Sequence, residues 1–402
     1  MKKIFFLALL ALLVVPTLSR AATYTPEEVR ACSLSYDASY FNCVINKGGQ
    51  KFGAAYMNTN GQEQTKYDVV KFAFFYSLDS KQFAYFVINN DKEYIVLNGK
   101  EQPKYDSVDG FSIVFSPDSK QFVYVASNKD GKQYLVRNGK AQLMKYDIAT
   151  TVFSPNSKRF AYRASNDGNH FIVLDGKALT KYRYIYDFVF SPDSKQYAYN
   201  VRTINNQWFM VINGKEQKAR YEGIDNFAFS PNSKQFVYEA EKNKQQFMVL
   251  NNKELTKYDD VGEITFSPDS KKFAYIARKG EKSFVVLNGK ELASYDSVFN
   301  LIFSDDSKQF AYSATRGDSS FIVLNNKELK SFDGIGMMRF SPDSKKYFYP
   351  GKIGDSYYLV MNDGSERKTF DFSDVGFTPD SKQIAIVNLV DGQLKRIVIN
   401  LK

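Results

Sequence analysis

The sequence is poor in the residues from which most metal and cofactor sites are built. It has one histidine, two cysteines and one tryptophan among 402 residues. A single histidine excludes a zinc or iron site made from several histidines, and two cysteines are too few for a cysteine-rich structural metal cluster. We therefore predict neither a metal site nor a cofactor.

Long hydrophobic runs are also missing, except near the first residue. Two lysines precede an apolar run over 4–15, and small residues follow at Ser19-Arg20-Ala21. This order is typical of a secretory signal peptide, and the run is shorter than the roughly 18 apolar residues of a membrane span. We predict a signal peptide over 1–21, cleaved after Ala21, and a periplasmic or secreted protein without a transmembrane segment. An uncleaved anchor is the alternative. Export also argues against a nucleic-acid partner.

Aromatic residues, by contrast, are abundant, with 35 phenylalanines and 28 tyrosines. Hydrophobic residues make up 44% of the chain and charged residues 24%. This composition allows a sizeable buried core and excludes a disordered polymer.

A turn pentapeptide repeats through most of the chain. Its full form is Ser-Pro-Asp-Ser-Lys, as at 116–120. Nine copies begin at Ser77, Ser116, Ser154, Ser191, Ser230, Ser267, Ser304, Ser341 and Thr378. Successive copies lie 37 to 39 residues apart. This interval is just under the period of four-stranded propeller blades.

Each repeat has the pattern of four short strands. Alternating aromatic and small residues suit a pleated strand, and Asn-Gly between two apolar runs, as at 288–289, is a strong hairpin signal. The Ser-Pro-Asp-Ser sequence is a turn, because proline presets φ and Asp or Ser bonds local amides. We predict one four-stranded antiparallel sheet per repeat, and sheets placed around an axis would bury both faces of each other.

The two ends of the repeat region complement each other. The last repeat stops near Asn400, where its fourth strand should begin, whereas 60–68 matches the fourth-strand segment 98–106. We predict an all-β protein with a single closed β-propeller over 60–402. Nine blades are expected, the last one completed by the N-terminal strand. Eight or ten blades are the alternatives, because 51–56 also resembles a second strand.

The repeated Phe-Ser-Pro-Asp-Ser-Lys-x-Phe-Ala-Tyr pattern resembles the WD-repeat-like propeller repeats of the TolB, tricorn and prolyl oligopeptidase families. The resemblance covers roughly 60–402. It implies a β-propeller and, through the TolB-like repeats, an interaction scaffold in a bacterial envelope, although a fold says little about function. The chain departs from these families by having Ser for the usual Gly in the turn and Phe for the Trp before it. It also lacks the separate α/β domain of TolB and has more repeats than the six blades of TolB.

The segment 22–59 is expected to precede the ring as an N-terminal extension. Thr-Pro-Glu-Glu at 25–28 has the form of a capped helix start, which predicts a short helix ending at Cys32. Cys43 follows in an extended stretch. In an exported protein we expect these cysteines to form a disulfide that fixes the extension. Two buried thiols are the alternative.

Signals for catalysis are weak. The chain has no Gly-x-Ser-x-Gly motif and no second domain of hydrolase size. His170 is the one imidazole, and its surroundings in the sequence do not include a recognisable nucleophile. We predict a protein that binds and does not catalyse. The alternative is a carbohydrate-active or peptide-cleaving enzyme that uses the mouth of the central channel.

Acidic residues recur at the junction before the first strand of each repeat. Eight of the nine junctions are acidic, at Asp68, Asp106, Asp147, Glu222, Asp259, Asp296, Asp333 and Asp371, and the ninth is Arg183. These carboxylates could surround the channel mouth and attract a cation or a basic peptide. The structural interpretation, which we favour, is that each Asp closes a turn by bonding backbone amides.

Binding residues are expected where the repeats differ from one another. The turns between the second and third strands vary in sequence, and binding commonly occurs in such loops. We predict a partner-binding surface on that face, formed by Trp208, His170, Arg202, Asn205 and Tyr357. A Trp packed into the seam between two blades is the alternative. The expected partner is a protein or peptide in the envelope, with a glycan as a second candidate.

Overall fold

The computed structural model describes residues 29–38, 41–46, 55–59, 62–369, 375–390 and 393–401. Every regular element among these residues is a β-strand. They form ten antiparallel sheets, which we number 1 to 10 in chain order. None of the described residues forms a helix of the length and hydrophobicity needed to cross a membrane. The predicted signal peptide at 1–21 and helix start at 25–28 lie outside the described residues.

The strands of each sheet are neighbours in chain order. Sheets 1 to 5 contain β1 (Val29–Leu34), β2 (Phe41–Asn46), β3 (Ala55–Thr59) and β4 (Gln62–Tyr67); β5 (Val69–Tyr76), β6 (Phe83–Asn89), β7 (Lys92–Leu97) and β8 (Lys100–Glu101); β9 (Ser107–Phe115), β10 (Phe122–Ser127), β11 (Gln133–Arg137) and β12 (Lys140–Leu143); β13 (Asp147–Phe153), β14 (Phe160–Asn166), β15 (Asn169–Leu174) and β16 (Lys177–Ala178); and β17 (Tyr184–Phe190), β18 (Tyr197–Arg202), β19 (Trp208–Ile212) and β20 (Lys215–Glu216).

Sheets 6 to 8 repeat the same order, and sheets 9 and 10 vary it. Sheets 6 to 10 contain β21 (Gly223–Phe229), β22 (Phe236–Lys242), β23 (Gln245–Leu250) and β24 (Lys253–Tyr258); β25 (Asp260–Phe266), β26 (Phe273–Lys279), β27 (Lys282–Leu287) and β28 (Lys290–Tyr295); β29 (Ser297–Phe303), β30 (Phe310–Arg316), β31 (Ser319–Leu324) and β32 (Lys327–Phe332); β33 (Gly334–Ile335), β34 (Arg339–Phe340), β35 (Tyr347–Ile353), β36 (Ser356–Met361) and β37 (Glu366–Thr369); and β38 (Val375–Phe377), β39 (Gln383–Val390) and β40 (Gln393–Asn400). In sheet 9 the first strand is split into β33 and β34, which both pair with β35.

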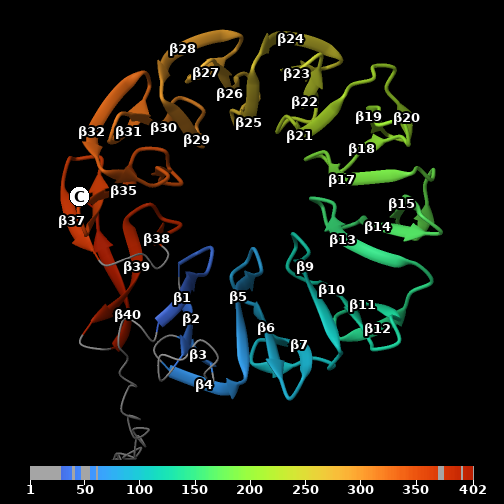
Figure 1. The fold of residues 1–402 in the computed structure, drawn as a ribbon. Coiled ribbons are helices and arrows are strands. Elements are labelled where there is room, and N and C mark those ends of the chain that lie inside the picture. The colour runs from blue at the N-terminus through green and yellow to red at the C-terminus, as the bar shows by residue number, and fades with distance from the viewer. Residues whose placement is uncertain are drawn as a thin grey trace, which may run out of the picture.

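The ten sheets stand side by side around a central axis, with the first strand of each nearest the centre (Figure 1). Apolar side chains fill the seams between them. Between sheets 5 and 6, for example, buried Ala198 and Met210 pack against Tyr221, Ile224 and Phe247. This arrangement confirms the predicted β-propeller of antiparallel four-stranded blades. The described residues form ten sheets and not nine, because 29–59 supplies three strands of an additional sheet.

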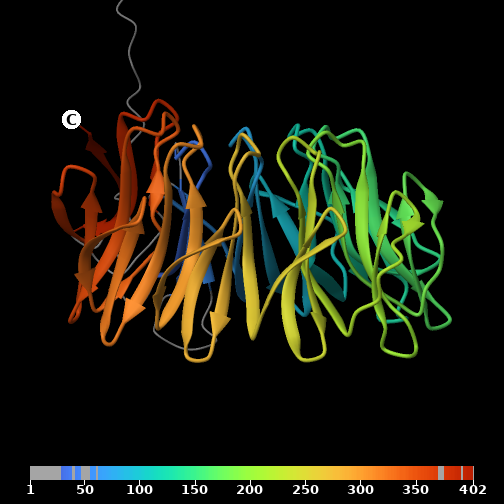
Figure 2. The same cartoon turned by 90° about the horizontal axis from the view of Figure 1, so that it is seen from above.

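The propeller has two faces, between which the strands run (Figure 2). The turns between the first and second strands lie on one side, which we call the turn face. The hairpin loops between the second and third strands lie on the other side, which we call the loop face. Because strands alternate in direction, the junction from one sheet to the next also lies on the loop face.

Hydrogen bonds within the Ser-Pro-Asp-Ser turn explain why its residues recur. In sheet 7, the Ser267 hydroxyl donates to Asp269 Oδ1 at 2.6 Å, and the Lys271 amide donates to the same oxygen at 3.0 Å. Ser267 Oγ accepts a bond from the Lys272 amide at 2.9 Å. The turn is therefore closed by its own side chains, as its sequence predicts.

The second serine of the turn links neighbouring sheets. In nine of the ten turns, the amide of the turn Asp or Asn donates to the hydroxyl of the second serine in the next sheet, at 2.8 to 3.1 Å. The accepting serines are Ser80, Ser119, Ser157, Ser194, Ser233, Ser270, Ser307, Ser344 and Ser381. All nine have a positive φ, between 56° and 64°. Glycine would suit this φ better, but it has no hydroxyl, which explains why Ser and not Gly stands at this position.

Alanine and glycine at this position should therefore have different effects. In the Ser233→Ala variant the unfavourable φ remains and the Asp193 amide loses its acceptor, so we expect a loss of about 1–2 kcal/mol in the free energy of unfolding. Ser233→Gly should lose less, because glycine adopts the φ of 60° at Ser233 without strain. Denaturant unfolding of both variants measures the difference. A larger loss for Gly than for Ala would contradict this explanation.

The ring closes by packing between sheets 1 and 10 and not by the predicted exchanged strand. Strand β4, which includes most of 60–68, pairs with β3 in sheet 1. Side chains of sheet 1, including Phe41 and Ile45, form a buried cluster with Ala385 and Val387 of β39. Arg396 of β40 donates from Nε to the Ala38 carbonyl. The pairing prediction was wrong because only two residues separate β3 from β4, and a local hairpin costs less loop entropy than pairing with the other end of the chain.

A tenth copy of the turn lies in sheet 1, at 35–38 (Ser-Tyr-Asp-Ala). The Ser35 hydroxyl donates to Asp37 Oδ1 at 2.7 Å, and Ala38 has a φ of 54°. Ala38 occupies the position of the second serine and has no hydroxyl, so the series of serine links cannot extend across the closing seam. The segment expected to be an extension before the ring is thus the first blade.

The predicted helix ending at Cys32 is wrong for its described part. Residues from Val29 to Leu34 form β1, because this segment pairs with β2 along its length. Cys32 and Cys43 are directly opposite each other in that pairing, and Cys43 is fully buried.

Candidate functional site

The acidic junction residues bind backbone amides of the hairpin loops. Carboxylate oxygens of six of them accept a bond from a loop amide of their own sheet, at 2.7 to 3.1 Å. The pairs are Asp68 with Asn90, Asp106 with Lys129, Glu222 with Asn243, Asp259 with Gly280, Asp296 with Gly317, and Asp333 with Gly354. These bonds give the six carboxylates a structural role, but the amides belong to the hairpin loop of the sheet and not to the junction turn that we expected.

The remaining junction residues differ from these six. Asp147 is exposed, and Asp371 lies outside the described residues. Arg183 donates from Nη1 to the Gly168 carbonyl at 2.6 Å. It therefore binds the same kind of hairpin loop, but as a donor to a carbonyl and not as an acceptor from an amide. In the part of the chain that the structure describes, no three acidic, histidine or cysteine side chains are grouped so as to hold a metal ion.

Because of the aspartates on the turn face, the stability of the fold should depend on pH. Hydrogen bonds from the Ser267 hydroxyl and the Lys271 amide hold the pKa of Asp269 below its usual value, and six other turn aspartates have a pKa lowered in the same way. A carboxylate whose pKa is lower in the folded state than in the unfolded state stabilises the fold at pH values above its unfolded pKa of about 4. This stabilisation is lost as the pH falls through the folded pKa. We therefore expect the melting temperature to fall below about pH 4.

Two natural asparagines provide the control for this prediction. Asn156 and Asn232 occupy the turn position of Asp269 and accept the same serine bond at 2.8 Å. A variant with Asp193→Asn and Asp269→Asn should fold at pH 7 and lose less stability in acid than the wild type. Thermal melts from pH 7 to pH 3 measure the difference. An equal fall for both proteins would show that these carboxylates do not cause it.

On the loop face, three of the predicted binding residues belong to one cluster of aromatic and cationic side chains. Arg202 lies over the rings of Tyr184, Tyr186 and Trp208, with Cζ at 4.6, 5.7 and 5.8 Å from the three ring centroids. The rings of Tyr186 and Trp208 stack at 4.6 Å, and the His170 ring lies 6.1 Å from that of Tyr184. We call these five residues the Arg202 cluster.

Strand register brings the members of the Arg202 cluster together. Tyr184 at the start of β17 is opposite Arg202 at the end of β18, and Arg202 is opposite Trp208 at the start of β19. These positions adjoin the variable loop between β18 and β19. Because all three are at strand ends and not within the loop itself, the sheet fixes their spacing.

Aromatic rings take the place of hydrogen-bond acceptors around Arg202. Its Nε is buried and has no acceptor among the described residues. A guanidinium over aromatic faces is stabilised by the ring quadrupoles, and N–H groups can point at the rings. The three rings therefore hold the guanidinium in one place.

The surroundings of His170 are cationic. Burial, followed by the positive charges of Arg163 and Arg183, lowers the pKa of His170 from its ordinary value of 6.5. The imidazole is consequently neutral at pH 7. Arg163 donates from Nη1 to the carbonyls of Ile185 and Tyr186, at 3.0 Å each. The cluster and its neighbours thus carry fixed positive charge, which suits a partner with a carboxylate.

The other two predicted residues lie outside this cluster. Asn205 is exposed in the loop between β18 and β19, beside Ile204, whose side chain is 77% exposed. Tyr357 is on β36 in sheet 9, where its ring lies 5.4 Å from Lys352 Nζ. Trp208 is half-buried and packs against the core between sheets 5 and 6, so the seam interpretation also holds for it.

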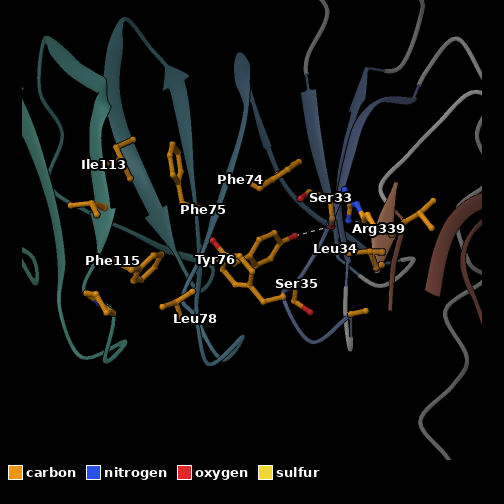
Figure 3. Close-up of a pocket in the computed structure, with 16 residues that line it drawn as sticks. Ser33, Leu34, Ser35, Phe74, Phe75, Tyr76, Leu78, Ile113, Phe115 and Arg339 are labelled. Atoms are coloured by element: carbon orange, nitrogen blue, oxygen red, sulfur yellow. Dashed lines mark hydrogen bonds between the residues drawn. The ribbon is translucent and has the colours of Figure 1, made fainter. Parts of the chain in front are cut away.

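Sequence reasoning missed a pocket on the inner wall of the ring. It has a volume of about 670 Å³ and is lined by the inner strands of sheets 1, 2, 3, 9 and 10 together with neighbouring turn residues. Figure 3 shows Phe74, Phe75 and Tyr76 along β5, between Ile113 on one side and Arg339 on the other. The Tyr76 hydroxyl donates to the Ser33 carbonyl at 2.8 Å. One available signal was the loss of the turn proline in the first two copies, at Tyr36 and Leu78.

No protein-family model and no curated protein matches the chain. Several solved structures are similar to it. One described as a eukaryotic initiation factor is 14% identical over 87% of this chain and 90% of that chain, with a TM-score of 0.48. The Dos1 propeller is 13% identical over 74% and 93%, with a TM-score of 0.40. An oligogalacturonate lyase in complex with manganese is 13% identical over 83% and 96%, with a TM-score of 0.37. These similarities do not indicate a function.

Proposed function

We propose that this β-propeller is a non-enzymatic, exported interaction scaffold in a bacterial envelope, and that it binds a protein partner through the Arg202 cluster. The observation that carries the proposal is the stacking of Arg202 with two tyrosines and a tryptophan beside a variable loop. Trp, Tyr and Arg are the residues that most often dominate binding energy at protein interfaces. The resemblance to TolB-like repeats is consistent with this role.

The positive charge of the cluster indicates what the partner presents. Arg202, Arg183 and Arg163 lie around His170 and Tyr184, and Ile204 adds an exposed apolar side chain beside them. An acidic segment with an apolar side chain would match both features. Carboxylates pair well with guanidinium groups, and a desolvated apolar contact adds affinity.

The position of His170 supports a binding role over a catalytic one. Strand register places Ser165 opposite His170 and Asp147 opposite Ser165. In this order the serine stands between the other two residues, whereas a catalytic triad needs the histidine between the serine and the carboxylate. The charges that act on the imidazole are those of two arginines.

We also propose that Cys32 and Cys43 form a disulfide in the exported protein. Their direct pairing across β1 and β2, together with the burial of Cys43, supports this. In the described part of the chain no cysteine is free. Alkylation of the unfolded protein with and without prior reduction, followed by mass spectrometry, tests the proposal. Two alkylated cysteines without reduction would contradict it.

Cross-linking in living cells tests the proposed function. A photo-reactive amino acid at Ile204 should form a cross-link to one defined protein, because this position adjoins the Arg202 cluster. The control position is Leu143 in sheet 3, which is also exposed, at 56%. Cross-links to the same protein from both positions, or from neither, would contradict a binding surface at the cluster.

A further inference from the structure

Lysines gather at the tips of the turn face. The hairpins between third and fourth strands also end at this face, because strands alternate in direction. Nine turns have a lysine directly after the second serine, at Lys81, Lys120, Lys158, Lys195, Lys234, Lys271, Lys308, Lys345 and Lys382. Seven of the hairpins carry another, at Lys100, Lys140, Lys177, Lys215, Lys253, Lys290 and Lys327. All sixteen are exposed, and they surround the axis as the sheets do (Figure 1). We call them the lysine ring.

The aspartates of the same turns lie closer to the backbone than the lysines do. In seven turns, Oδ1 of the aspartate accepts bonds from a serine or threonine hydroxyl and from the lysine amide, so the carboxylate is folded back onto the turn. The side chain of Asp269 is 39% exposed, whereas that of Lys271 is 82% exposed. The values for Asp306 and Lys308 are 36% and 81%. The ammonium groups therefore reach further into solvent than the carboxylates.

Glutamates that follow the hairpin lysines point away from the turn face. Glu291 Oε1 accepts a bond from the Tyr258 hydroxyl at 3.1 Å, and Glu328 Oε1 accepts one from Arg316 Nη2 at 2.7 Å. Tyr258 ends a fourth strand and Arg316 ends a second strand, so both lie at the loop-face ends of their sheets. These carboxylates thus leave the hairpin tips to the lysines.

Carboxylates neutralise little of the lysine ring. Among the described residues, Lys271 and Lys308 are the members of the ring that form an ion pair, each with the aspartate of its own turn, at 3.9 and 3.4 Å. Asp305 and Asp363 are exposed at the turn face of sheets 8 and 9. The outer layer of this face is therefore most strongly cationic over sheets 2 to 7.

Two neighbouring turns of the same face carry exposed apolar side chains. The second position of the turn is proline in seven of the ten copies. Sheets 1 and 2 instead have Tyr36 and Leu78, whose side chains are 65% and 57% exposed. Apolar and aromatic side chains beside lysines are typical of surfaces that lie in the headgroup region of a bilayer. They favour a lipid surface over a polyanion in solution, which would contact the lysines alone.

We propose that the turn face docks on the surface of a bilayer that contains anionic lipids. The lysine ring contacts the headgroups, and Tyr36 and Leu78 enter the boundary between headgroups and acyl chains. Each lysine close to such a surface strengthens binding about fivefold. The Arg202 cluster, on the loop face, then points away from the bilayer. The inference needs no protein partner, so it is independent of the proposed function.

Co-sedimentation with lipid vesicles tests this proposal directly. The chain comprising 22–402 is used, because the apolar run at 4–15 could itself enter a bilayer. Vesicles of equal parts phosphatidylglycerol and phosphatidylcholine are compared with vesicles of phosphatidylcholine alone. We expect binding to the anionic vesicles, and we expect added salt to weaken it because salt screens exposed charges. Absence of binding, or equal binding to both kinds of vesicle, would overturn the proposal.

Two double variants of equal charge locate the docking surface. Lys158→Gln combined with Lys195→Gln removes two charges from the lysine ring and should weaken binding to the anionic vesicles about thirtyfold. Lys132→Gln combined with Lys242→Gln removes two exposed charges from the loop face and should bind like the wild type. Circular dichroism and thermal melts confirm that each variant is folded. Equal affinity of the two double variants would overturn the assignment to the turn face.

A substitution at an exposed apolar residue distinguishes a bilayer from a polyanion in solution. Leu78→Ser should weaken vesicle binding about tenfold, because less apolar surface enters the bilayer, and it should leave binding to heparin unchanged. Ile204→Ser, at an exposed apolar residue of the loop face, is the matched control and should bind vesicles like the wild type. If Leu78→Ser bound vesicles as tightly as Ile204→Ser, the lysines would recognise anionic groups without a bilayer, and the proposal would be wrong.

Discussion

Replacing Phe41 with alanine is expected to lower the free energy of unfolding by about 3–5 kcal/mol. Phe41 is 3% exposed and belongs to the buried cluster that joins sheet 1 to Ala385 and Val387 of sheet 10. Removing its phenyl ring leaves a cavity at the seam between sheets 1 and 10, which the serine links do not cross. The loss should therefore weaken closure of the ring as well as the packing of sheet 1.

The measurement for Phe41→Ala combines denaturant unfolding with limited proteolysis. Cleavage is expected to begin in sheets 1 and 10, because these sheets lose contact first. Tyr36→Ala is the control within the same sheet, since this side chain is 65% exposed, and it should change stability by less than about 0.5 kcal/mol. If Phe41→Ala were as stable as Tyr36→Ala, the cluster would not hold the ring closed.

The second large effect is expected at the Arg202 cluster. Arg202→Ala should weaken binding of the partner identified from Ile204 by about 2–4 kcal/mol, the size typical of an interface hot spot. Arg202→Lys should also weaken binding, because an ammonium lacks the planar shape that stacks between the rings of Tyr184 and Trp208. Titration calorimetry with the purified partner measures both losses.

Two controls separate recognition from stability in this experiment. Trp208→Phe keeps an aromatic ring against the core between sheets 5 and 6, so it should fold normally and still bind more weakly. Tyr357→Ala changes a residue that was predicted to belong to the same surface but lies in sheet 9. It should leave the affinity unchanged. Full affinity of Arg202→Ala, or a loss for Tyr357→Ala equal to that for Arg202→Ala, would exclude the Arg202 cluster as the binding surface.

The repeating unit could be read from the sequence because its chemistry is local. A turn closed by Ser267 and Asp269 needs only residues within five positions of each other. The alternation of apolar residues then fixes which side of each strand is buried. Local rules of this kind give the strands and the turns of a propeller without any knowledge of long-range contacts.

The first blade was missed because its turn has lost most of the repeated signal. At 35–38 the proline is replaced by tyrosine and the second serine by alanine, and the next copy follows 42 residues later. Only Ser35 and Asp37 keep the pattern, and both make the expected bond. Because this blade was not predicted, Gln62–Tyr67 was interpreted as a strand without a local partner.

The candidate sites were predictable only in part, because they depend on strand register and on contacts between sheets. Position in the repeat indicated that Trp208 and Arg202 lie on the loop face. The pairing of Tyr184 with Arg202 requires the register of β17 against β18, which periodicity does not specify. The inner-wall pocket is lined by both Phe75 and Arg339, which are far apart in the chain and come to the same part of the ring only in the closed fold.

The central claim is that sheet 1 is a blade of the ring and closes it against sheet 10. A fragment comprising 60–402 tests this most directly, because it removes three strands of sheet 1 and keeps β4. The account predicts that this fragment melts at least about 10 °C below a chain comprising 22–402, with a larger radius of gyration per residue in small-angle scattering. A compact fragment with an unchanged melting temperature would mean that β4 completes the last blade, and it would contradict the account.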